Sequence, residues 1–318
     1  MINRRNFLEL SAAAAAGWAL PVEAAHVAGA GNVRFVFFTD THIEPELSGS
    51  RGVARALAKI KAARPEFCIQ GGDHCYDLTA TPRQRSTMLL DLYSKTEQVL
   101  DMPIHHVIGN HDVFGTLPMS GVSHTDPLWG KKAFYDHFGK PHTSWDYKGY
   151  HFITLDSIHL DANGKFAPII DEEQREWLAA DLAATPAGMP IIGITHVPLV
   201  SAVPQYAHEV YPYFKVSNAY DVLPLFEGHN VIAVLQGHTH VNEVVYWRNV
   251  PYITSGAVCG NWWKGSRWGT PEGFTVVELS GGRIRWRYEV YGWTSAAPER
   301  DPYPIITNPS IPGSWPKI

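Results

Sequence analysis

The sequence predicts an α/β fold with a parallel β-sheet at its centre, and three observations support this prediction. Apolar runs rich in β-branched and aromatic residues occur at residues 33–38, 67–70 and 104–108. Two stretches with helical spacing of apolar residues, 51–63 and 82–100, separate these runs. A strand–helix–strand–helix–strand order at these lengths is typical of βαβ units. Polar residues follow each run, and ligands of parallel sheets bind at the carboxyl ends of the strands.

The alternation of strands and helices continues through the middle of the chain and gives way to strands near its end. Asp171 is a candidate N-cap, followed by acidic residues in the first turn of a helix. The Gly281-Gly282 pair predicts a hairpin turn between the last two strands. Residues 113–147 are expected to form loops. The other predicted strands are 150–156, 190–194, 231–235, 244–248, 252–255, 274–279 and 284–290, and the other helices are 171–184 and 218–228.

The composition is that of an ordinary globular protein and argues against some partners. The chain has 318 residues, of which 45% are hydrophobic and 18% charged, enough for a large core. Its net charge is −5, and no run of lysine and arginine stands out beyond the N-terminus. Proteins that grip nucleic acid duplexes normally carry a basic stripe, so we expect no such partner. The three cysteines make no disulfide framework, although a bridge between Cys75 and Cys259 is an open alternative.

Residues 1–30 have the pattern of an export signal and a linker. Arg4 and Arg5 precede an apolar stretch of small residues that reaches Leu20, which resembles a bacterial twin-arginine signal peptide. The stretch is too short for a spanning helix with flanks, so we expect an exported protein, periplasmic or extracellular, without a stable membrane anchor. An N-terminal amphipathic helix that stays attached is the alternative. We expect one domain over residues 31–297 and a proline-rich tail over residues 298–318.

Five polar clusters occur where predicted strands end, and their side chains are metal ligands or acid–base groups. Because the carboxyl ends of parallel strands lie at one edge of a sheet, we expect the clusters to meet and form one two-metal site. The clusters are Asp40-Thr41-His42, Gly71-Gly72-Asp73, Gly109-Asn110-His111-Asp112, Thr195-His196 and Gly237-His238-Thr239-His240.

Two metal ions about 3.5–4 Å apart need one ligand that contacts both ions and further ligands on each side. Asp73, at the end of a central strand, is the candidate for the shared ligand. Asp40 and His42 are two residues apart on an extended segment and point the same way, and His238 and His240 repeat this spacing. Carboxylate, amide and imidazole ligands without thiolate favour iron, manganese or zinc over calcium. The complete candidate ligand set is Asp40, His42, Asp73, Asn110, His196, His238 and His240.

In order and in spacing, these motifs resemble those of the calcineurin-like metallophosphoesterases, over residues 33 to about 293. The resemblance implies a four-layer α/β/β/α sandwich with two mixed β-sheets. It also implies how the ligands are shared between two divalent or trivalent ions. One ion would be held by Asp40, His42, Asp73 and His240, and the other by Asp73, Asn110, His196 and His238.

The resemblance further implies the reaction, which is hydrolysis of a phosphodiester, or of a phosphomonoester, of a small molecule. A hydroxide that bridges the two ions would attack phosphorus, while the ions neutralise charge on the phosphoryl oxygens. His111 would stabilise the phosphoryl group and protonate the leaving alcohol. Asp112 would be the residue that orients His111.

Residues near the motifs favour one branch of this family. Protein Ser/Thr phosphatases have an Asp-Arg-Gly extension after the shared aspartate and a glutamate at the position of Asp112, and this chain has neither. Tyr76 occupies the position of a tyrosine ligand of purple acid phosphatases, but those enzymes lack a counterpart of His42, so we expect Tyr76 to be a neighbour of the site. The pattern most resembles the bacterial cyclic-nucleotide phosphodiesterase branch. The alternatives are a purple-acid-phosphatase-like monoesterase and a catalytically silent metal-binding module of the same fold.

Two aromatic segments are candidate walls of a substrate pocket. Residues 206–214 contain four aromatic residues, and residues 255–265 follow a strand near the same rim. Such rings can stack on a base or enclose a choline-like head group, and covering the sheet edge is the alternative role. Other polar residues are expected to support loops around the ligands or to pack within strands. The loop candidates are His74, Asp77, Asp156 and His159, and the strand candidates are His105, His106 and His151.

Overall fold

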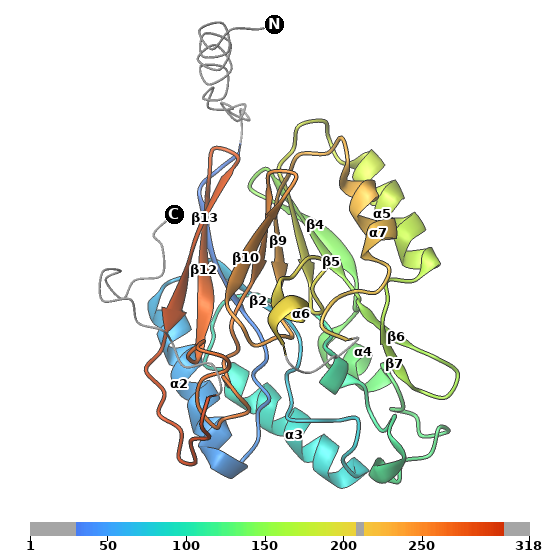
Figure 1. Ribbon diagram of the computed structural model, residues 1–318, viewed down its shortest axis with the longest axis vertical. Helices are drawn as coiled ribbons and strands as arrows, with labels where there is room; N and C mark the ends of the chain where they lie inside the picture. The colour runs from blue at the N-terminus through green and yellow to red at the C-terminus, as the bar shows by residue number, and fades with distance from the viewer. Residues whose placement is uncertain (1–29, 208–212, 302–318) are drawn as a thin grey trace, which may run out of the picture.

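The computed structural model describes residues 30–207 and 213–301, whose strands form two large mixed sheets packed face to face (Figure 1). In spatial order, the first sheet contains β13 (Arg283–Val290), β12 (Gly273–Ser280), β1 (Val33–Phe38), β2 (Phe67–Gln70) and β3 (Ile104–His106). The second contains β10 (Glu243–Trp247), β11 (Val250–Thr254), β9 (Val231–Gln236), β8 (Ile191–Thr195), β5 (Tyr150–Leu155) and β4 (Thr143–Tyr147). A separate hairpin pairs β6 (Ile158–Leu160) with β7 (Phe166–Pro168).

Each sheet combines parallel strands with antiparallel ones, which lie on one side of the first sheet and on both sides of the second. In the first sheet β1, β2 and β3 are parallel, and β12 and β13 add to β1 as an antiparallel hairpin. In the second sheet β5, β8, β9 and β11 are parallel, while β4 and β10 are antiparallel edge strands. The predicted parallel core is therefore confirmed, and it occurs twice.

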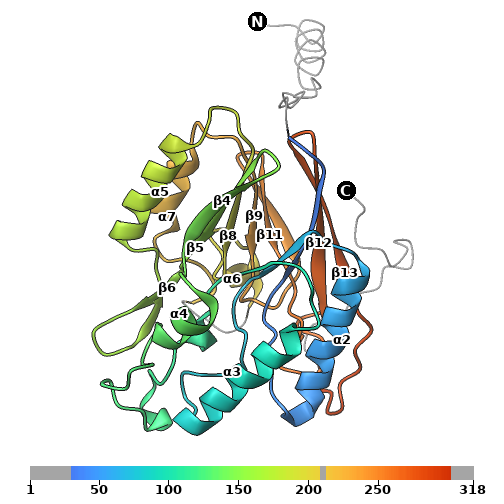
Figure 2. The same ribbon diagram turned by 180° about the vertical axis from the view of Figure 1, so that it is seen from behind.

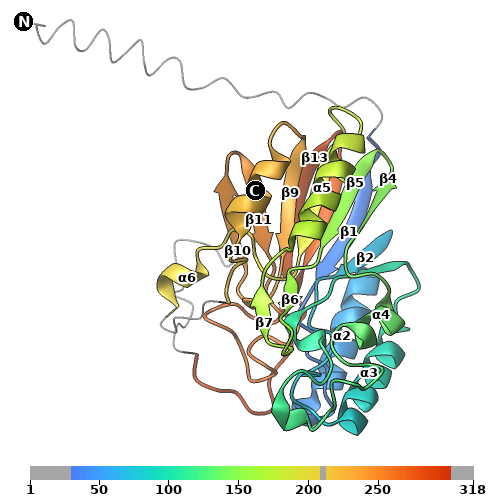
Figure 3. The same ribbon diagram turned by 90° about the vertical axis from the view of Figure 1, so that its right-hand side faces the viewer.

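Helices cover the outer face of each sheet and complete the four layers of the expected sandwich. The helices α2 (Gly49–Ala62) and α3 (Arg83–Glu97) lie on the first sheet (Figure 2), and α5 (Glu172–Ala184) and α7 (Ala219–Val222) lie on the second (Figure 3). The short helices α4 and α6 span Lys132–Phe138 and Val203–Tyr206. Single 3-10 turns occur at Glu46–Ser48, Asn110–Asp112, Pro118–Ser120 and Leu223–Phe226.

Three apolar clusters correspond to the three interfaces between the four layers. Leu57 of α2 packs on the first sheet, and Leu178 of α5 packs on the second. Between the sheets, Phe35 stacks on Phe67 with ring centroids 5.0 Å apart and meets Phe152 of the opposite sheet edge-on at 5.7 Å. The α/β/β/α architecture is thus built from side chains that alternate between two buried faces of each central strand.

Several local predictions differ from the structure for identifiable reasons. The predicted helix 218–228 is α7 followed by a 3-10 turn, because Pro224 has no N–H for a continuous helix. The predicted loop 113–147 contains α4 and β4, and the hairpin of β6 and β7 was not predicted. The N-cap prediction is confirmed, since Asp171 accepts a hydrogen bond from the backbone N–H of Gln174 at 2.9 Å.

The polar clusters follow strands of both sheets. Asp40, Asp73 and Asn110 come after β1, β2 and β3, whereas His196 and His238 come after β8 and β9. The predicted signal at residues 1–30 and the predicted tail lie almost entirely outside the described residues. Within residues 30–207 and 213–301, no helix has the length and apolar character needed to cross a membrane.

Candidate metal centre

The first ligand group combines residues that follow β1, β2 and β9. His42 Nε2 lies 3.4 Å from Asp73 Oδ2 and 3.9 Å from Asp40 Oδ1. His240 Nε2 approaches the same Asp40 oxygen at 3.3 Å. These four side chains are at least 95% buried. They are the set expected to hold one of the two ions.

The second ligand group shares Asp73 with the first. His196 Nε2 lies 3.3 Å from Asp73 Oδ2 and 3.2 Å from Asn110 Oδ1. Asp73, His196 and His238 offer ligand atoms that all lie within 4.8 Å of one another. Because one oxygen of Asp73 faces His42 on one side and His196 on the other, this carboxylate has the position that a ligand shared by two ions needs.

Backbone carbonyl groups hold the four imidazoles in fixed orientations. A carbonyl oxygen only accepts hydrogen bonds, so the ring nitrogen in contact with it must carry a proton, and in the neutral ring the other nitrogen offers a lone pair. Three rings use Nδ1 for this contact and the fourth uses Nε2. The pairs are His42 with Tyr76 (3.1 Å), His196 with Gly71 (2.8 Å), His240 with Gly260 (2.6 Å) and, through Nε2, His238 with Tyr213 (3.0 Å).

The backbone at the ligands is strained in a common way. Five ligands have left-handed backbones, with φ between 37° and 71°. Such conformations cost non-glycine residues about 1–3 kcal/mol each, and they cluster at functional sites. Gly109 relieves crowding here, since a Cβ would lie 2.1 Å from Asp73 Oδ1. The left-handed ligands are Asp40, His42, Asp73, His238 and His240.

The neighbouring imidazoles keep the two buried carboxylates ionised. Burial alone would raise the pKa of Asp40, but the charge of His240 outweighs it and leaves the pKa well below the ordinary value. Burial is likewise outweighed at Asp73, where His196 makes the largest lowering contribution to the pKa. Both side chains are therefore carboxylates at neutral pH, the form that binds metal.

The imidazoles divide into two types. Burial lowers the pKa of His42 to about 4 and that of His238 to about 3, so both rings are neutral at pH 7 and ready to bind a metal. Burial also acts on His196, but the charge of Asp73 outweighs it and raises the pKa to about 9. A metal ion beside Asp73 can supply the positive charge that this proton otherwise provides.

Two atoms at the centre of the first group lack hydrogen-bond partners among the described residues. They are Asp40 Oδ1 and His42 Nε2, both inaccessible to solvent. The other oxygen of Asp40 accepts bonds from Thr39 Oγ1 at 2.7 Å and from the backbone N–H of His238 at 3.0 Å. Buried polar atoms normally have partners, and a cation here would satisfy both. The residues present therefore fit a bound metal ion.

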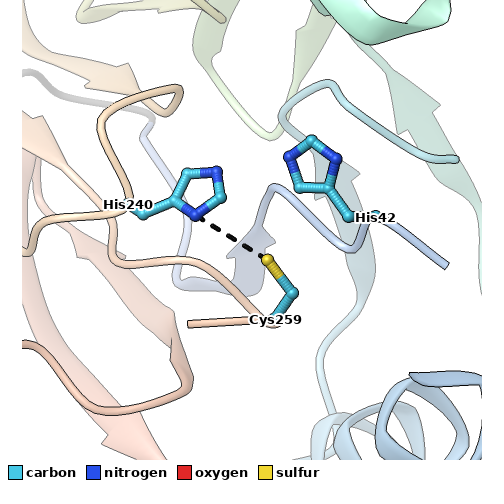
Figure 4. A group of neighbouring side chains, drawn as sticks. All are labelled: His42, His240 and Cys259. Atoms are coloured by element: carbon cyan, nitrogen blue, oxygen red, sulfur yellow. Dashed lines mark hydrogen bonds between the residues drawn. The ribbon is translucent and has the colours of Figure 1, made fainter. Parts of the chain in front are cut away.

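Cys259 adjoins the first group, because its sulfur and ligand atoms of His42 and His240 all lie within 4.8 Å of one another. Figure 4 shows its sulfur beside the Nδ1 side of His240, at 3.7 Å. That nitrogen is held by the carbonyl of Gly260, while His240 Nε2 faces Asp40. Burial, with a further contribution from Asp40, raises the pKa of the Cys259 thiol well above its ordinary value. All three cysteines of the chain are buried and free, so the open Cys75–Cys259 bridge is absent.

The carboxylate within hydrogen-bond distance of the His111 ring is that of Asp77, which corrects the orienting role expected of Asp112. His111 Nδ1 lies 3.4 Å from Asp77 Oδ1. Asn110, His111 and Asp112 form a 3-10 turn, in which successive side chains point about 120° apart. His111 therefore faces the cavity, and Asp112 turns back beneath the loop.

Asp112 joins the two loops that carry Asp73 and Asn110. Its Oδ2 accepts hydrogen bonds from the backbone N–H groups of Asp73 and Gly109, both at 2.9 Å, and from His74 Nδ1 at 2.8 Å. Its Oδ1 accepts from the backbone N–H of His74 at 2.9 Å. Sequence reasoning placed Asp77 and His74 among loop residues and gave no signal for these specific contacts.

A cavity of about 400 Å³ opens beside the second ligand group. One side is polar, with six residues from the motifs, and the other is mostly aromatic. Two lining residues were not predicted from the sequence. Phe166 belongs to the hairpin of β6 and β7, which was not predicted, and Arg267 belongs to a loop that carries no motif. The lining residues are Asp73, Asn110, His111, Phe166, Tyr213, Phe214, His238, Thr239, His240, Trp262 and Arg267.

Comparisons with known proteins agree with this geometry. The chain is similar to a dimetal phosphatase from Danio rerio, with 16% identity, a TM-score of 0.62, and coverage of 82% of this chain and 96% of that chain. It is similar to GAP50, the anchor in the inner membrane complex of Plasmodium (19%, TM-score 0.55, 88% and 93%). It also resembles the purple acid phosphatase PPD1 from Lupinus luteus (14%, TM-score 0.56), matching 81% of this chain but about half, 52%, of the phosphatase. These likenesses show the fold.

No curated protein gives a significant match to the chain. The family model described as calcineurin-like phosphoesterase matches residues 33–242, which is more than half of the chain and includes every candidate ligand. The chain therefore belongs to the calcineurin-like phosphoesterase family and is a metal-dependent phosphoester hydrolase.

Proposed function

We propose that the protein hydrolyses phosphodiesters of small organic molecules at a pair of metal ions. The lining of the cavity supports this choice. Four of its residues are aromatic, Phe166, Tyr213, Phe214 and Trp262, and Arg267 is the one arginine or lysine among the described lining residues. A phosphodiester carries one negative charge and two organic groups, which match a single guanidinium and extended apolar walls. A phosphomonoester carries more charge and offers these walls only one group.

The residues divide the work of the reaction among them. When bound, two metal ions supply Lewis-acid charge and an activated water. Asp73 would hold both ions, and Asn110 and His238 line the cavity that would receive the phosphoryl group. As the new bond from water oxygen to phosphorus forms, the bond from phosphorus to the leaving oxygen breaks. His111 delivers a proton from Nε2 to that oxygen.

The surroundings of His111 suit a proton donor. Burial acts to lower the pKa of His111, but Asp73 and then Asp77 outweigh it and raise the pKa above the ordinary value. The ring nitrogen opposite Asp77 is Nε2, which is free to face a leaving group in the cavity. A protonated imidazole at neutral pH is the form required for general acid catalysis.

The environment of Tyr76 argues against the monoesterase alternative. The backbone carbonyl of Tyr76, rather than its phenol, contacts the ligand His42. Its phenol lines a neighbouring cavity, and burial raises the pKa of that phenol, so it remains neutral. A tyrosine ligand would need a phenolate directed at the ions.

The test compares bis(p-nitrophenyl) phosphate with p-nitrophenyl phosphate, using purified protein reconstituted with Mn²⁺, Zn²⁺ or Fe²⁺. We expect a higher kcat/KM for the diester, and loss of both activities after chelation. A preference for the monoester would contradict the proposal and favour the acid-phosphatase-like alternative. Turnover of neither substrate with both ions bound would favour the catalytically silent module.

We also propose that residues 1–30 direct export by the twin-arginine route. The pair Arg4 and Arg5 ahead of a short apolar stretch supports this proposal. Changing both to lysine is expected to retain the protein in the cytoplasm, measured by cell fractionation. Unchanged export of the double variant would contradict the proposal.

A further inference from the structure

Trp262 lies in the loop after β11, half-buried among the rings of the metal centre. Its ring centroid is 3.9 Å from that of His42, 4.9 Å from that of His111 and 5.8 Å from that of His240. It also meets Tyr76 edge-on at 5.3 Å. The indole thus packs on two ligands of the first ion and adjoins the proton donor of the proposed reaction.

The backbone holds this indole in place despite strain. Trp262 and its neighbour Trp263 have left-handed φ angles of 52° and 65°. Bulky residues rarely adopt this conformation, and it persists where the surrounding structure enforces it, often at functional sites. Two consecutive outliers at a metal centre therefore call for a functional explanation.

Trp263 provides the enforcing contacts. Its side chain is fully buried, and its Nε1 donates a hydrogen bond to the carbonyl oxygen of His42 at 2.9 Å. The ring packs on Gly52 of α2, where a Cβ would come within 2.1 Å of it. The loop is thereby attached to the same residue, His42, whose ring Trp262 covers.

Trp262 also lines two cavities. It lines the catalytic cavity of about 400 Å³ and a second cavity of about 280 Å³, which includes Glu44 and the phenol of Tyr76. The catalytic cavity is lined by Asn110 and His238 of the second ligand group and by Asp73 and His240 of the first, whereas His42 lines neither cavity. The first ion position therefore faces the catalytic cavity through Asp73 and His240, and its His42 side, where the indole packs, faces neither cavity.

We propose that Trp262 is a specificity-determining residue that covers the first ion position and bars organic groups of the substrate from the second cavity. Both groups of a phosphodiester must then fit within the catalytic cavity, between the motif residues and rings such as Tyr213. The protein consequently selects diesters whose organic groups are small. The proposed selectivity for small organic groups rests on the proposed diester activity. The proposed cover of the first ion position rests on the ring contacts alone.

The experiment compares Trp262→Gly with Trp262→Phe in the metal-loaded, full-length protein. Glycine suits the left-handed backbone, so Trp262→Gly removes the indole without new strain, while phenylalanine retains a planar cover. Tyr246→Ala, which truncates a 56% exposed ring on β10, is the control for loss of an aromatic side chain. Circular dichroism checks the fold of each variant.

The first readout is the ratio of kcat/KM for bis(p-nitrophenyl) phosphate to kcat/KM for methyl p-nitrophenyl phosphate. Joining the two cavities is expected to raise this ratio about tenfold in Trp262→Gly, a change typical of an altered pocket wall. Trp262→Phe and Tyr246→Ala are expected to keep the ratio of the unchanged protein. An unchanged or lower ratio in Trp262→Gly would overturn the proposed selectivity.

The second readout is the rate at which dipicolinate removes metal, which requires no turnover. The slower phase of release is expected to accelerate about tenfold in Trp262→Gly, the scale of effects seen when groups around metal ligands are changed. Equal release rates in all four proteins would overturn the covering role. If the unchanged protein hydrolyses neither ester, the proposed diester activity fails, and this release experiment still decides the role of Trp262.

Discussion

Replacing Asp112 with asparagine removes a buried charge that joins two loops of the metal centre. The carboxylate is 1% exposed and accepts four hydrogen bonds, three at Oδ2 and one at Oδ1. Asparagine has a single oxygen. If this oxygen takes the position of Oδ2, it keeps the three hydrogen bonds there. The NH₂ group then takes the position of Oδ1 and faces the backbone N–H of His74, so that two donors face each other.

The expected magnitude follows from this mismatch. One hydrogen bond to a charged group, which contributes about 1.5–3 kcal/mol, is lost, and leaving buried donors unsatisfied costs about 1–3 kcal/mol more. We therefore expect the free energy of unfolding to fall by about 3–5 kcal/mol, a large part of the 5–15 kcal/mol typical of a domain. Urea unfolding of the metal-free variants, followed by circular dichroism, measures the difference.

Asp77→Asn is the matched control, because Asp77 contacts the ring of His111 and lies in the same loop region. It removes the charge of a side chain that is 17% exposed, and the amide oxygen that remains can still accept the hydrogen bonds from the backbone N–H and Oγ1 of Thr79, so we expect a loss in stability below about 1 kcal/mol. The assignment of Asp112 as a loop junction is refuted if its asparagine variant loses less than about 1 kcal/mol. It is also refuted if the two variants are equally destabilised.

The remaining predictions concern turnover and metal content. His111→Ala is expected to lower kcat on bis(p-nitrophenyl) phosphate by about 10²–10⁴-fold while the bound metal stays constant, and unchanged kcat would exclude His111 as the proton donor. Asp77 helps to raise the pKa of His111, so in Asp77→Asn the ring should lose its proton at lower pH. The alkaline limb of the kcat–pH profile should then move to lower pH, and a shift to higher pH would contradict this role of Asp77. Gly109→Ala places a Cβ 2.1 Å from Asp73 Oδ1, so mass spectrometry of metals should find less bound metal, and a full complement would show that the loop adjusts.

The sequence predicted the parts of the fold and site that depend on local pattern. The strands before Asp40, Asp73 and His238 are apolar runs buried on both faces, and polar residues directly after them mark their ends. Because parallel strands align their carboxyl ends, ligand clusters far apart in the chain could be assigned to one site. That inference required no knowledge of side-chain conformations.

The partners of the catalytic residues depend on backbone details that no pattern indicates. His111 and Asp112 are adjacent in sequence, but the 3-10 turn directs them apart, to Asp77 and His74 respectively. The covering position of Trp262 depends on a left-handed backbone, which sequence patterns signal at glycine and not at tryptophan. Tertiary contacts impose these conformations, so they became visible only in the folded structure.

The most direct test of the two-ion site is a titration of metal-free protein with Mn²⁺ in which bound metal and turnover of bis(p-nitrophenyl) phosphate are measured together. Asp73 Oδ2 lies within 3.4 Å of His42 Nε2 and 3.3 Å of His196 Nε2, so both ion positions depend on it. We predict two ions per chain, with turnover rising as the second ion binds, and loss of both in Asp73→Ala. Full turnover with one ion per chain, or two ions retained by Asp73→Ala, would contradict the account.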